Sequence, residues 1–150
     1  MKLPLSALIG LVLTGLFVFT AIFANFLAPY PVDAIVGKVW ESPSSQFLLG
    51  TDTIGRDILS RLIFGAQVTI FVALASSLLA FSMGSFFGFL AATRGGWVDT
   101  GLSRLVDLMM AVPSLIVALV VLSVLPLNLL VLILVMGVLD STRVFRLSRA

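Results

Sequence analysis

The sequence predicts an all-α, multi-pass membrane protein with four membrane-spanning helices. Hydrophobic residues make up 60% of the chain and charged residues only 11%, whereas a soluble domain carries about 25% charged residues. Long uncharged stretches alternate with short polar segments, and an α-helix needs about 20 residues to cross a bilayer. The chain therefore has too little polar surface for a water-exposed globule.

Composition also excludes several classes of function. The chain has no Cys and no His, which excludes disulfides, thiol chemistry and metal sites with Cys or His ligands. The acidic residues form no close carboxylate pair within one predicted span, so we predict no enzyme activity, no bound cofactor and no metal site. The net charge of +2 and the lack of Lys/Arg runs give no indication of nucleic-acid binding.

The first span is predicted at Leu5–Ala28, directly after Lys2. A cleaved signal peptide is the alternative, because Lys2 resembles its basic start, but the apolar region of a signal peptide is normally ~7–15 residues long. We therefore favour an uncleaved span. Pro29-Tyr30-Pro31 ends this helix, and a polar loop follows over residues 32–47, with Trp40 suited to the headgroup level.

A charged segment comes next, between the loop and the second span. Gly50-Thr51-Asp52-Thr53 is predicted as a turn, with Thr51, Asp52 or Thr53 capping a new helix. Two acid-first i,i+4 pairs, Asp52/Arg56 and Asp57/Arg61, favour that helix. We predict an interfacial helix that leads into the membrane, and its apolar residues share one face: Ile54, Ile58, Leu59, Leu62 and Ile63.

The second span, Val68–Ala92, is rich in small residues. Gly84 and Gly88 lie four positions apart, and Ala80 extends the pattern by one turn. Small residues at this spacing let helix backbones approach closely in lipid. We therefore predict a span packed inside a bundle.

The last apolar stretch, Leu108–Leu139, follows an interfacial turn at Arg94–Trp97 and a short amphipathic lead-in. As one helix the stretch would be about 48 Å long, more than one bilayer core of ~30 Å and less than two. We predict a third span at Leu105–Leu125, kinked near Pro113, then a turn at Pro126 and a fourth span from Leu127. One long kinked helix is the alternative.

Four spans put both termini on one side of the membrane. Three basic residues lie on the side of the loop: Lys38, Arg56 and Arg61. Six lie on the opposite side: Lys2, Arg94, Arg104, Arg143, Arg146 and Arg149. The positive-inside rule then predicts cytoplasmic termini, with the charged segment outside.

The residue order over Leu49–Arg61 closely resembles the L-G-T-D-x-x-G-R-D-x-x-S-R signature of ABC importer permeases for dipeptides, oligopeptides and nickel. The segments Gly95–Asp99, Arg104–Asp107 and Pro113-Ser114 fit the same family in the same order. The signature residues in this chain are Gly50, Thr51, Asp52, Gly55, Arg56, Asp57, Ser60 and Arg61.

The resemblance implies part of a type I ABC importer transmembrane domain in the cell (inner) membrane. Residues 1–67 would form the first span, external loop and interfacial helix, and residues 68–150 the beginning of the permease domain. The implied partners are a second similar permease, two cytoplasmic ATPase subunits that bind the ATP, and an extracytoplasmic substrate-binding protein. Because Ala150 precedes the family's Glu-Ala-Ala loop, we interpret the chain as a truncated permease that cannot couple ATP hydrolysis to transport alone.

Some residues carry functional hypotheses beside a simpler interpretation. Asp107, Pro113 and Ser114 are candidates for a kinked solute path, although an ion pair of Asp107 with Arg104 is the favoured interpretation. Asp140 is expected to pair with Arg143 in the same way. Arg143, Arg146 and Arg149 are candidates for contact with the ATPase or lipid phosphates, or act only as topology determinants. The alternative function is a small four-span accessory or assembly membrane protein without transport activity.

Overall fold

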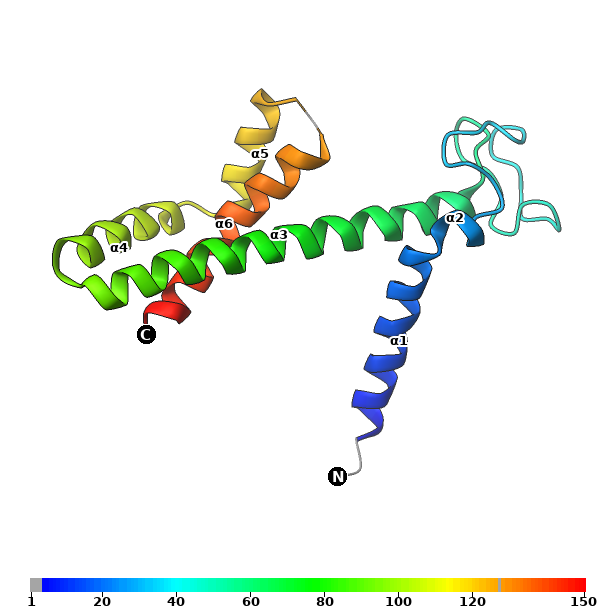
Figure 1. Cartoon of the computed structure of the whole chain (residues 1–150). Coiled ribbons are helices and arrows are strands. Elements are labelled where there is room, and N and C mark those ends of the chain that lie inside the picture. Colours follow the sequence, from blue (N-terminus) through cyan, green and yellow to red (C-terminus); the bar gives the residue numbers. More distant parts are fainter. Residues whose placement is uncertain (1–3, 127) are drawn as a thin grey trace. The chain divides into compact units, whose positions relative to one another are not determined.

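The computed structural model describes residues 4–126 and 128–150 (Figure 1). Every regular element in these ranges is a helix, which confirms the predicted all-helical class. Contacts divide the chain into two compact units, an N-terminal unit of Met1–Phe71 and a C-terminal unit of Val72–Ala150, which we describe separately. The helices are α1 (Leu5–Ile22), α2 (Ala24–Leu27), α3 (Ile58–Arg94), α4 (Gly96–Ala111), α5 (Ser114–Val124) and α6 (Leu129–Arg149).

Two helices of the described residues, α1 and α3, are long and apolar enough to cross a membrane. The pair α4 and α5 adds a third span if the two helices count as one. Exposed Leu, Val, Ile and Phe side chains cover α1, as expected for a helix that faces lipid. The structure thus supports two or three spans.

The N-terminal unit begins with α1, which ends at Ile22, and the short α2 follows after Phe23. The span predicted at Leu5–Ala28 is therefore present but interrupted at Phe23, whose ring packs against that of Phe19 with centroids 4.6 Å apart. Lys2 lies outside the described residues.

In the C-terminal unit, α3 and α4 meet at the predicted turn, where Gly95 and Gly96 have positive φ angles of 58° and 53°. The predicted kink near Pro113 is a complete break, and α4 and α5 differ in direction by 83°. Proline lacks the N–H that a continuous helix requires, and it favours extended backbone in the preceding residue. Val112 is accordingly extended, with φ −101° and ψ 133°.

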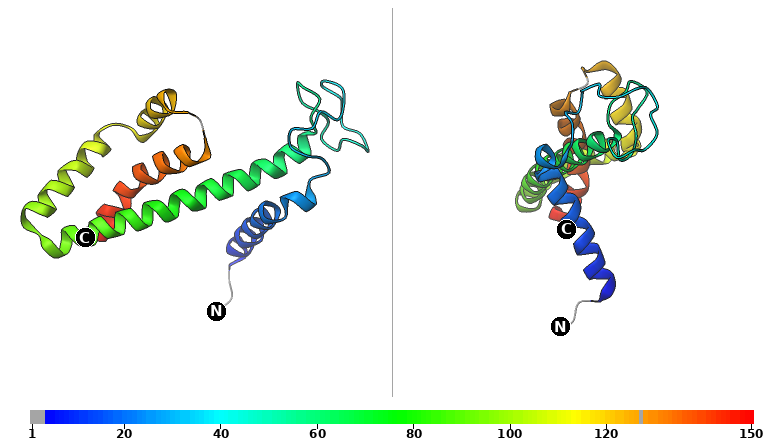
Figure 2. Two further views of the ribbon diagram at one scale, coloured as in Figure 1. Left: turned by 45° about the horizontal axis from the view of Figure 1, so that its top comes forward. Right: turned by 90° about the vertical axis from the view of Figure 1, so that its right-hand side faces the viewer.

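The last helix, α6, packs against both α4 and α5 (Figure 2). It begins at Leu129, where the Asn128 side chain accepts a hydrogen bond of 2.8 Å from the N–H of Val131. The predicted start at Leu127 lies outside the described residues. Because α5 and α6 are separate helices in contact, the alternative of one long kinked helix is wrong.

The predicted close packing of small residues is present between α3 and α6. A Cβ atom on Gly84 would lie 2.5 Å from the Cβ of Val144, and one on Gly88 would lie 2.7 Å from the Cβ of Ser148. The side chain of Leu79 on α3 lies against Gly137 of α6, in the space that a Cβ atom there would occupy. Glycines on both helices therefore permit this approach.

Candidate functional site

The signature residues form a hydrogen-bonded turn ahead of α3, which begins at Ile58. The predicted helix through Ile54 is therefore wrong. Gly55 explains the difference, because its φ of +88° is left-handed and its N–H closes a turn onto the carbonyl of Asp52 at 3.1 Å. The prediction treated Gly55 as an ordinary helical position, although glycine commonly marks such a turn.

Asp52 is the centre of this turn. Its carboxylate accepts hydrogen bonds from the backbone N–H groups of Ile54 and Arg56, at 2.8 and 3.0 Å. It also accepts from Nε of Arg56 at 2.9 Å and from a terminal nitrogen of Arg61 at 2.6 Å. The predicted Asp52/Arg56 pair is confirmed. The Arg61 side chain bonds to Asp52 rather than to Asp57, so the predicted Asp57/Arg61 ion pair is wrong. The Asp57 carboxylate is engaged by Ser60 instead.

Asp57 precedes α3 and caps it, in place of the predicted caps Thr51, Asp52 and Thr53. Its carboxylate accepts from both the N–H and the hydroxyl of Ser60, at 2.8 and 2.7 Å. The Ser60 hydroxyl oxygen also accepts from the N–H of Tyr30 at 3.1 Å. These bonds join the beginning of the loop to the start of α3.

Thr51 and two glycines complete the turn. The Thr51 hydroxyl donates to the carbonyl of Lys38 and accepts from the N–H of Glu41. Gly50, like Gly55, has a positive φ angle, here 77°. The signature residues Thr51, Asp52, Asp57 and Ser60 are all buried. Their arrangement therefore fixes the local backbone.

Acid should weaken this turn through Asp52. The backbone N–H of Arg56 above all, with the N–H of Ile54 and the Arg56 side chain, holds the pKa of Asp52 well below its usual range. A carboxylate with a lowered folded-state pKa stabilises the fold above its unfolded pKa of about 3.9, and the contribution is lost as the pH falls through the folded value. We expect the loop to loosen below about pH 4.

Trp40 reports on this transition, because its backbone N–H donates to the carbonyl of Asp52. Its fluorescence is measured in a Trp97→Phe background, so that Trp40 is the single tryptophan. The Asp52→Asn variant should be looser at neutral pH and should lose the acid transition. An unchanged transition in that variant would assign it to another group.

The cap gives a second, smaller prediction. Asp57→Ala should cost about 1 kcal/mol of helix stability, because the first-turn N–H groups lose their acceptor. Hydrogen exchange of the amides from Ser60 onward should accelerate, while exchange in the middle of α3 stays unchanged. The Asp57→Asn variant retains a capping side chain and should behave nearly as the wild type. Equal acceleration in both variants would contradict the assignment.

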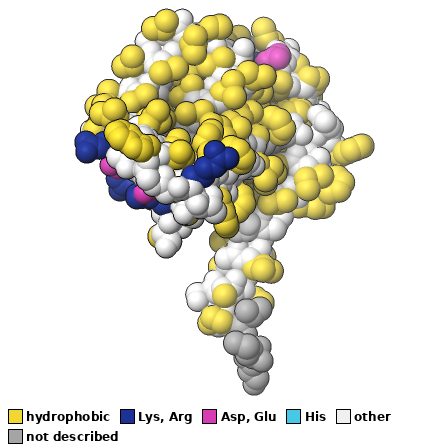
Figure 3. All heavy atoms as spheres, turned by 60° about the vertical axis from the view of Figure 1, so that its left-hand side comes forward, with side chains coloured by type: hydrophobic (Ala, Val, Ile, Leu, Met, Phe, Trp, Pro, Cys, Tyr) yellow, Lys and Arg dark blue, Asp and Glu magenta, His cyan; other side chains and the backbone are white. Residues whose placement is uncertain are grey.

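Ion pairs between α4 and α6 organise one end of the C-terminal unit. Arg146 donates to Asp107 at 2.7 Å, and Arg149 donates to Asp99 at 2.7 Å. Within the described part of the chain, the partner of Asp107 is Arg146 and not Arg104, so the predicted local pair is wrong. Figure 3 shows basic and acidic side chains close together at the left of a mainly hydrophobic face, with other charged side chains elsewhere on it.

The other predicted residues meet at the helix break. Pro113 and Ser114 line a cavity of about 280 Å³ that also contains Asp140 and Arg143 of α6. The expected pair of Asp140 with Arg143 is present at 3.8 Å. Asp107 lies elsewhere, so the three candidates for a solute path are not together. Sequence reasoning missed Asp140 here, because its position depends on how α6 packs against the break.

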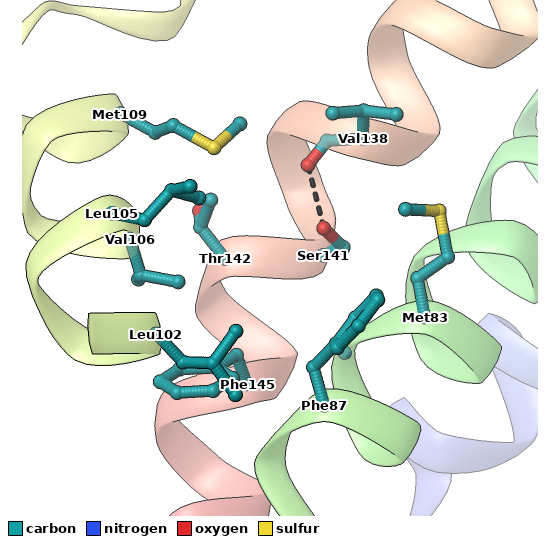
Figure 4. Close-up of a pocket in the computed structure, with 11 residues that line it drawn as sticks. Met83, Phe87, Leu102, Leu105, Val106, Met109, Val138, Ser141, Thr142 and Phe145 are labelled. Atoms are coloured by element: carbon teal, nitrogen blue, oxygen red, sulfur yellow. Dashed lines mark hydrogen bonds between the residues drawn. The ribbon is translucent and has the colours of Figure 1, made fainter. Parts of the chain in front are cut away.

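A second cavity of about 320 Å³ lies between α3, α4 and α6 and is mainly apolar (Figure 4). Phe145 enters it from α6, and Met83 and Phe87 enter it from α3. The Ser141 hydroxyl bonds to its own helix, since it donates to the carbonyl of Val138 at 2.7 Å. Across residues 4–126 and 128–150, no group of three or more acidic side chains is placed to hold a metal ion.

Two family models match the chain. The family described as the N-terminal TM domain of oligopeptide transport permease C matches residues 6–46. The family described as a binding-protein-dependent transport system inner membrane component matches residues 84–150. The two matches lie in sequence order on either side of the signature.

Curated relatives agree with these matches. A dipeptide transport system permease protein of Haemophilus influenzae is 36% identical over 97% of this chain and 52% of its own length. A di/tripeptide transport system permease protein of Pseudomonas aeruginosa is 35% identical over 97% of this chain and 50% of its own length. An oligopeptide transport system permease protein of Bacillus subtilis is 32% identical over 95% of this chain and 47% of its own length.

The chain thus spans about half the length of these relatives. The matches nevertheless extend over nearly all of the chain, and they include the signature turn and the glycine-packed helices. The chain is thus similar to permeases of binding-protein-dependent transport systems, by the family model over residues 84–150 and by the peptide permeases along most of its length.

Proposed function

We propose that the chain is a translocation subunit of an ATP-driven importer for peptides or another small solute such as nickel. The observation that carries this proposal is the sequence identity of 36% and 35% with two peptide permeases, over 97% of the chain. The glycine contacts between α3 and α6 support it, because they build a helix pair suited to packing within lipid. The subunit itself performs no chemistry and holds no cofactor.

The proposed partners are a second similar permease, two cytoplasmic ATPases that bind the ATP, and an extracytoplasmic binding protein. Together they would move solute by alternating access. We propose four spans in the cell inner membrane, with cytoplasmic termini, because six basic residues then lie inside and three outside. Residues 1–67 would supply the first span and the outer loop, and residues 68–150 would begin the permease domain.

The signature turn would lie outside and have a structural role, holding the start of α3 in place. Its buried Asp52 and Asp57 support this role, since both carboxylates are engaged within the turn. Arg143, Arg146 and Arg149 would lie near the inner face, close to the ATPase or lipid phosphates. Arg146 and Arg149 also hold α6 against α4. Pro113 and Ser114 would lie on the solute path.

Association with a second permease tests the proposal. The tagged chain is co-expressed with a full-length peptide permease of the partner type and purified in mild detergent. We expect the two to co-purify. The Gly84→Leu variant, which disrupts the α3–α6 pair, should lose the partner, and Gly101→Leu, at an open position, should keep it. Failure of the wild type to associate would favour the accessory-protein alternative.

The absence of Cys makes the orientation directly measurable. A single cysteine at Ser45 should react with an impermeant maleimide added to the outside of right-side-out vesicles. A cysteine at Ser148 should react only after the vesicles are opened. The reverse pattern would overturn the proposed orientation.

A further inference from the structure

The cavity at the break between α4 and α5 combines features of a solute-contact site. We propose that it is water-filled, opens near the inner face of the membrane and binds a zwitterion, with Asp140 facing the cationic group and Arg143 the anionic group. The inference deepens the proposed function and rests on it for the choice of a dipeptide as the solute. It assigns a contact role to two residues that otherwise look like a simple surface pair.

The length of α5 places the break within an apolar stretch. Its 11 residues rise about 16 Å, which is too short for a bilayer core of ~30 Å. A span that contains α5 must therefore also contain the break at Pro113. The stretch Leu108–Leu139 around it carries no charge, so this irregular backbone lies in an otherwise hydrophobic part of the chain.

The break leaves backbone groups without helical partners. The last carbonyls of α4 and the first N–H groups of α5 have none within their own helices, and no side chain caps the start of α5. Such backbone is tolerated in a membrane only where protein buries it or where it lines a water-filled cavity. The cavity of about 280 Å³ at Pro113 and Ser114 has the volume that the second condition requires, since a water molecule takes roughly 30 Å³.

The charges at this cavity are held loosely. Asp140 and Arg143 are 3.8 Å apart, with side chains 48% and 71% exposed, whereas Arg146 contacts Asp107 at 2.7 Å. A loose pair can exchange its partner for a solute at little cost. Ionisable groups beside an apolar stretch are expensive and mark solute pathways.

The two helix ends at the break favour the two charges of a zwitterion. The C-terminus of α4 carries the negative end of a helix dipole and favours cations, and the N-terminus of α5 favours anions. The cavity thus offers one cationic and one anionic locus close together. A free dipeptide, with an ammonium and a carboxylate, has the matching chemistry.

Cysteine labelling of the chain in lipid vesicles tests the first part, because the wild type has no Cys. Ser114→Cys should react with a charged, membrane-impermeant methanethiosulfonate. The matched control is Val120→Cys, which lies on the same helix, is exposed and does not line this cavity. The control should react at least about tenfold more slowly, because an apolar environment raises the thiol pKa and one pKa unit removes tenfold of the thiolate. Equal rates would overturn the water-filled cavity.

Protection by solute tests the second part. Glycylglycine should slow the labelling of Ser114→Cys, and its N-acetylated amide, which has neither charge, should not. Adding Asp140→Asn or Arg143→Gln should abolish protection while labelling persists, and adding Asp99→Asn should leave protection intact. Equal protection by both compounds, or no protection by either, would overturn the charge assignment. Because this assay needs no second permease, its failure is separate from a failure of association.

Discussion

Replacing Gly84 by alanine should force α3 away from α6 and destabilise the C-terminal unit by about 1–3 kcal/mol, as overpacking does in other tightly packed cores. The added Cβ would lie 2.5 Å from the Cβ of Val144 and 2.6 Å from the carbonyl oxygen of Ser141. Two of its nearest neighbours, the Ser141 carbonyl and the Phe145 nitrogen, are backbone atoms that no side-chain rotation can move. Unfolding of the purified chain in mixed micelles, followed by circular dichroism, measures the loss.

Gly101→Ala is the matched control. Gly101 lies in α4 of the same unit and has open space around its Cβ position. Alanine there should be neutral or stabilising by about 0.5–1 kcal/mol, because glycine weakens a helix interior. If both variants moved the unfolding curve in the same direction, helix propensity rather than the α3–α6 contact would govern the effect.

Replacing Gly55 by alanine should open the signature turn. With φ at +88°, an L-residue is strained, and the left-handed conformation costs about 1–2 kcal/mol. The new Cβ would also overlap the carbonyl oxygen of Gly37. Since 1–2 kcal/mol corresponds to a factor of about 5–30 in an equilibrium, cleavage within the loop by a soluble protease should accelerate by at least that factor.

The control for this prediction is Gly65→Ala. Gly65 lies on α3 with nothing near its Cβ position, so the substitution should leave the cleavage rate unchanged. An equal rise in both variants would mean that cleavage reports the general stability of the chain. The pH dependence of Asp52 then offers an independent measure of the same turn.

The parts of the fold that depend on local composition could be predicted from the sequence. Apolar runs placed α1 and the core of α3, and the spacing of Gly84 and Gly88 indicated the side on which α3 packs closely. Each of these features follows from residues that are neighbours along one helix. The turn at Gly95 followed in the same way, since two adjacent glycines favour left-handed backbone.

The prediction for the signature segment failed because its local pattern was compatible with both a helix and a turn. Acidic and basic residues four positions apart suit a helix, and Asp52 and Arg56 do pair, but around a turn. Gly50 and Gly55 carried the missing signal. Arg61 pairs with Asp52 across nine positions, and helical periodicity does not place residues at that separation next to each other.

The cavity at Pro113 could not be predicted for a different reason. Proline indicates a kink, but the 83° angle also depends on how α6 packs against both α4 and α5. The same packing brings Arg146 to Asp107 over 39 positions and sets Asp140 beside the break. Side chains from different helices define this site, so their proximity exists only in the folded unit.

The bond between the Ser60 hydroxyl and the N–H of Tyr30 spans 30 positions and closes the chain segment between these two residues at its base. The segment therefore forms a closed loop, and the bond that closes it does not depend on how many residues the loop contains. Extra residues inserted near Ser45 would enlarge the loop while leaving both helix ends where they are. The segment can thus accept a longer loop or a fused epitope with no change to the helices on either side of it.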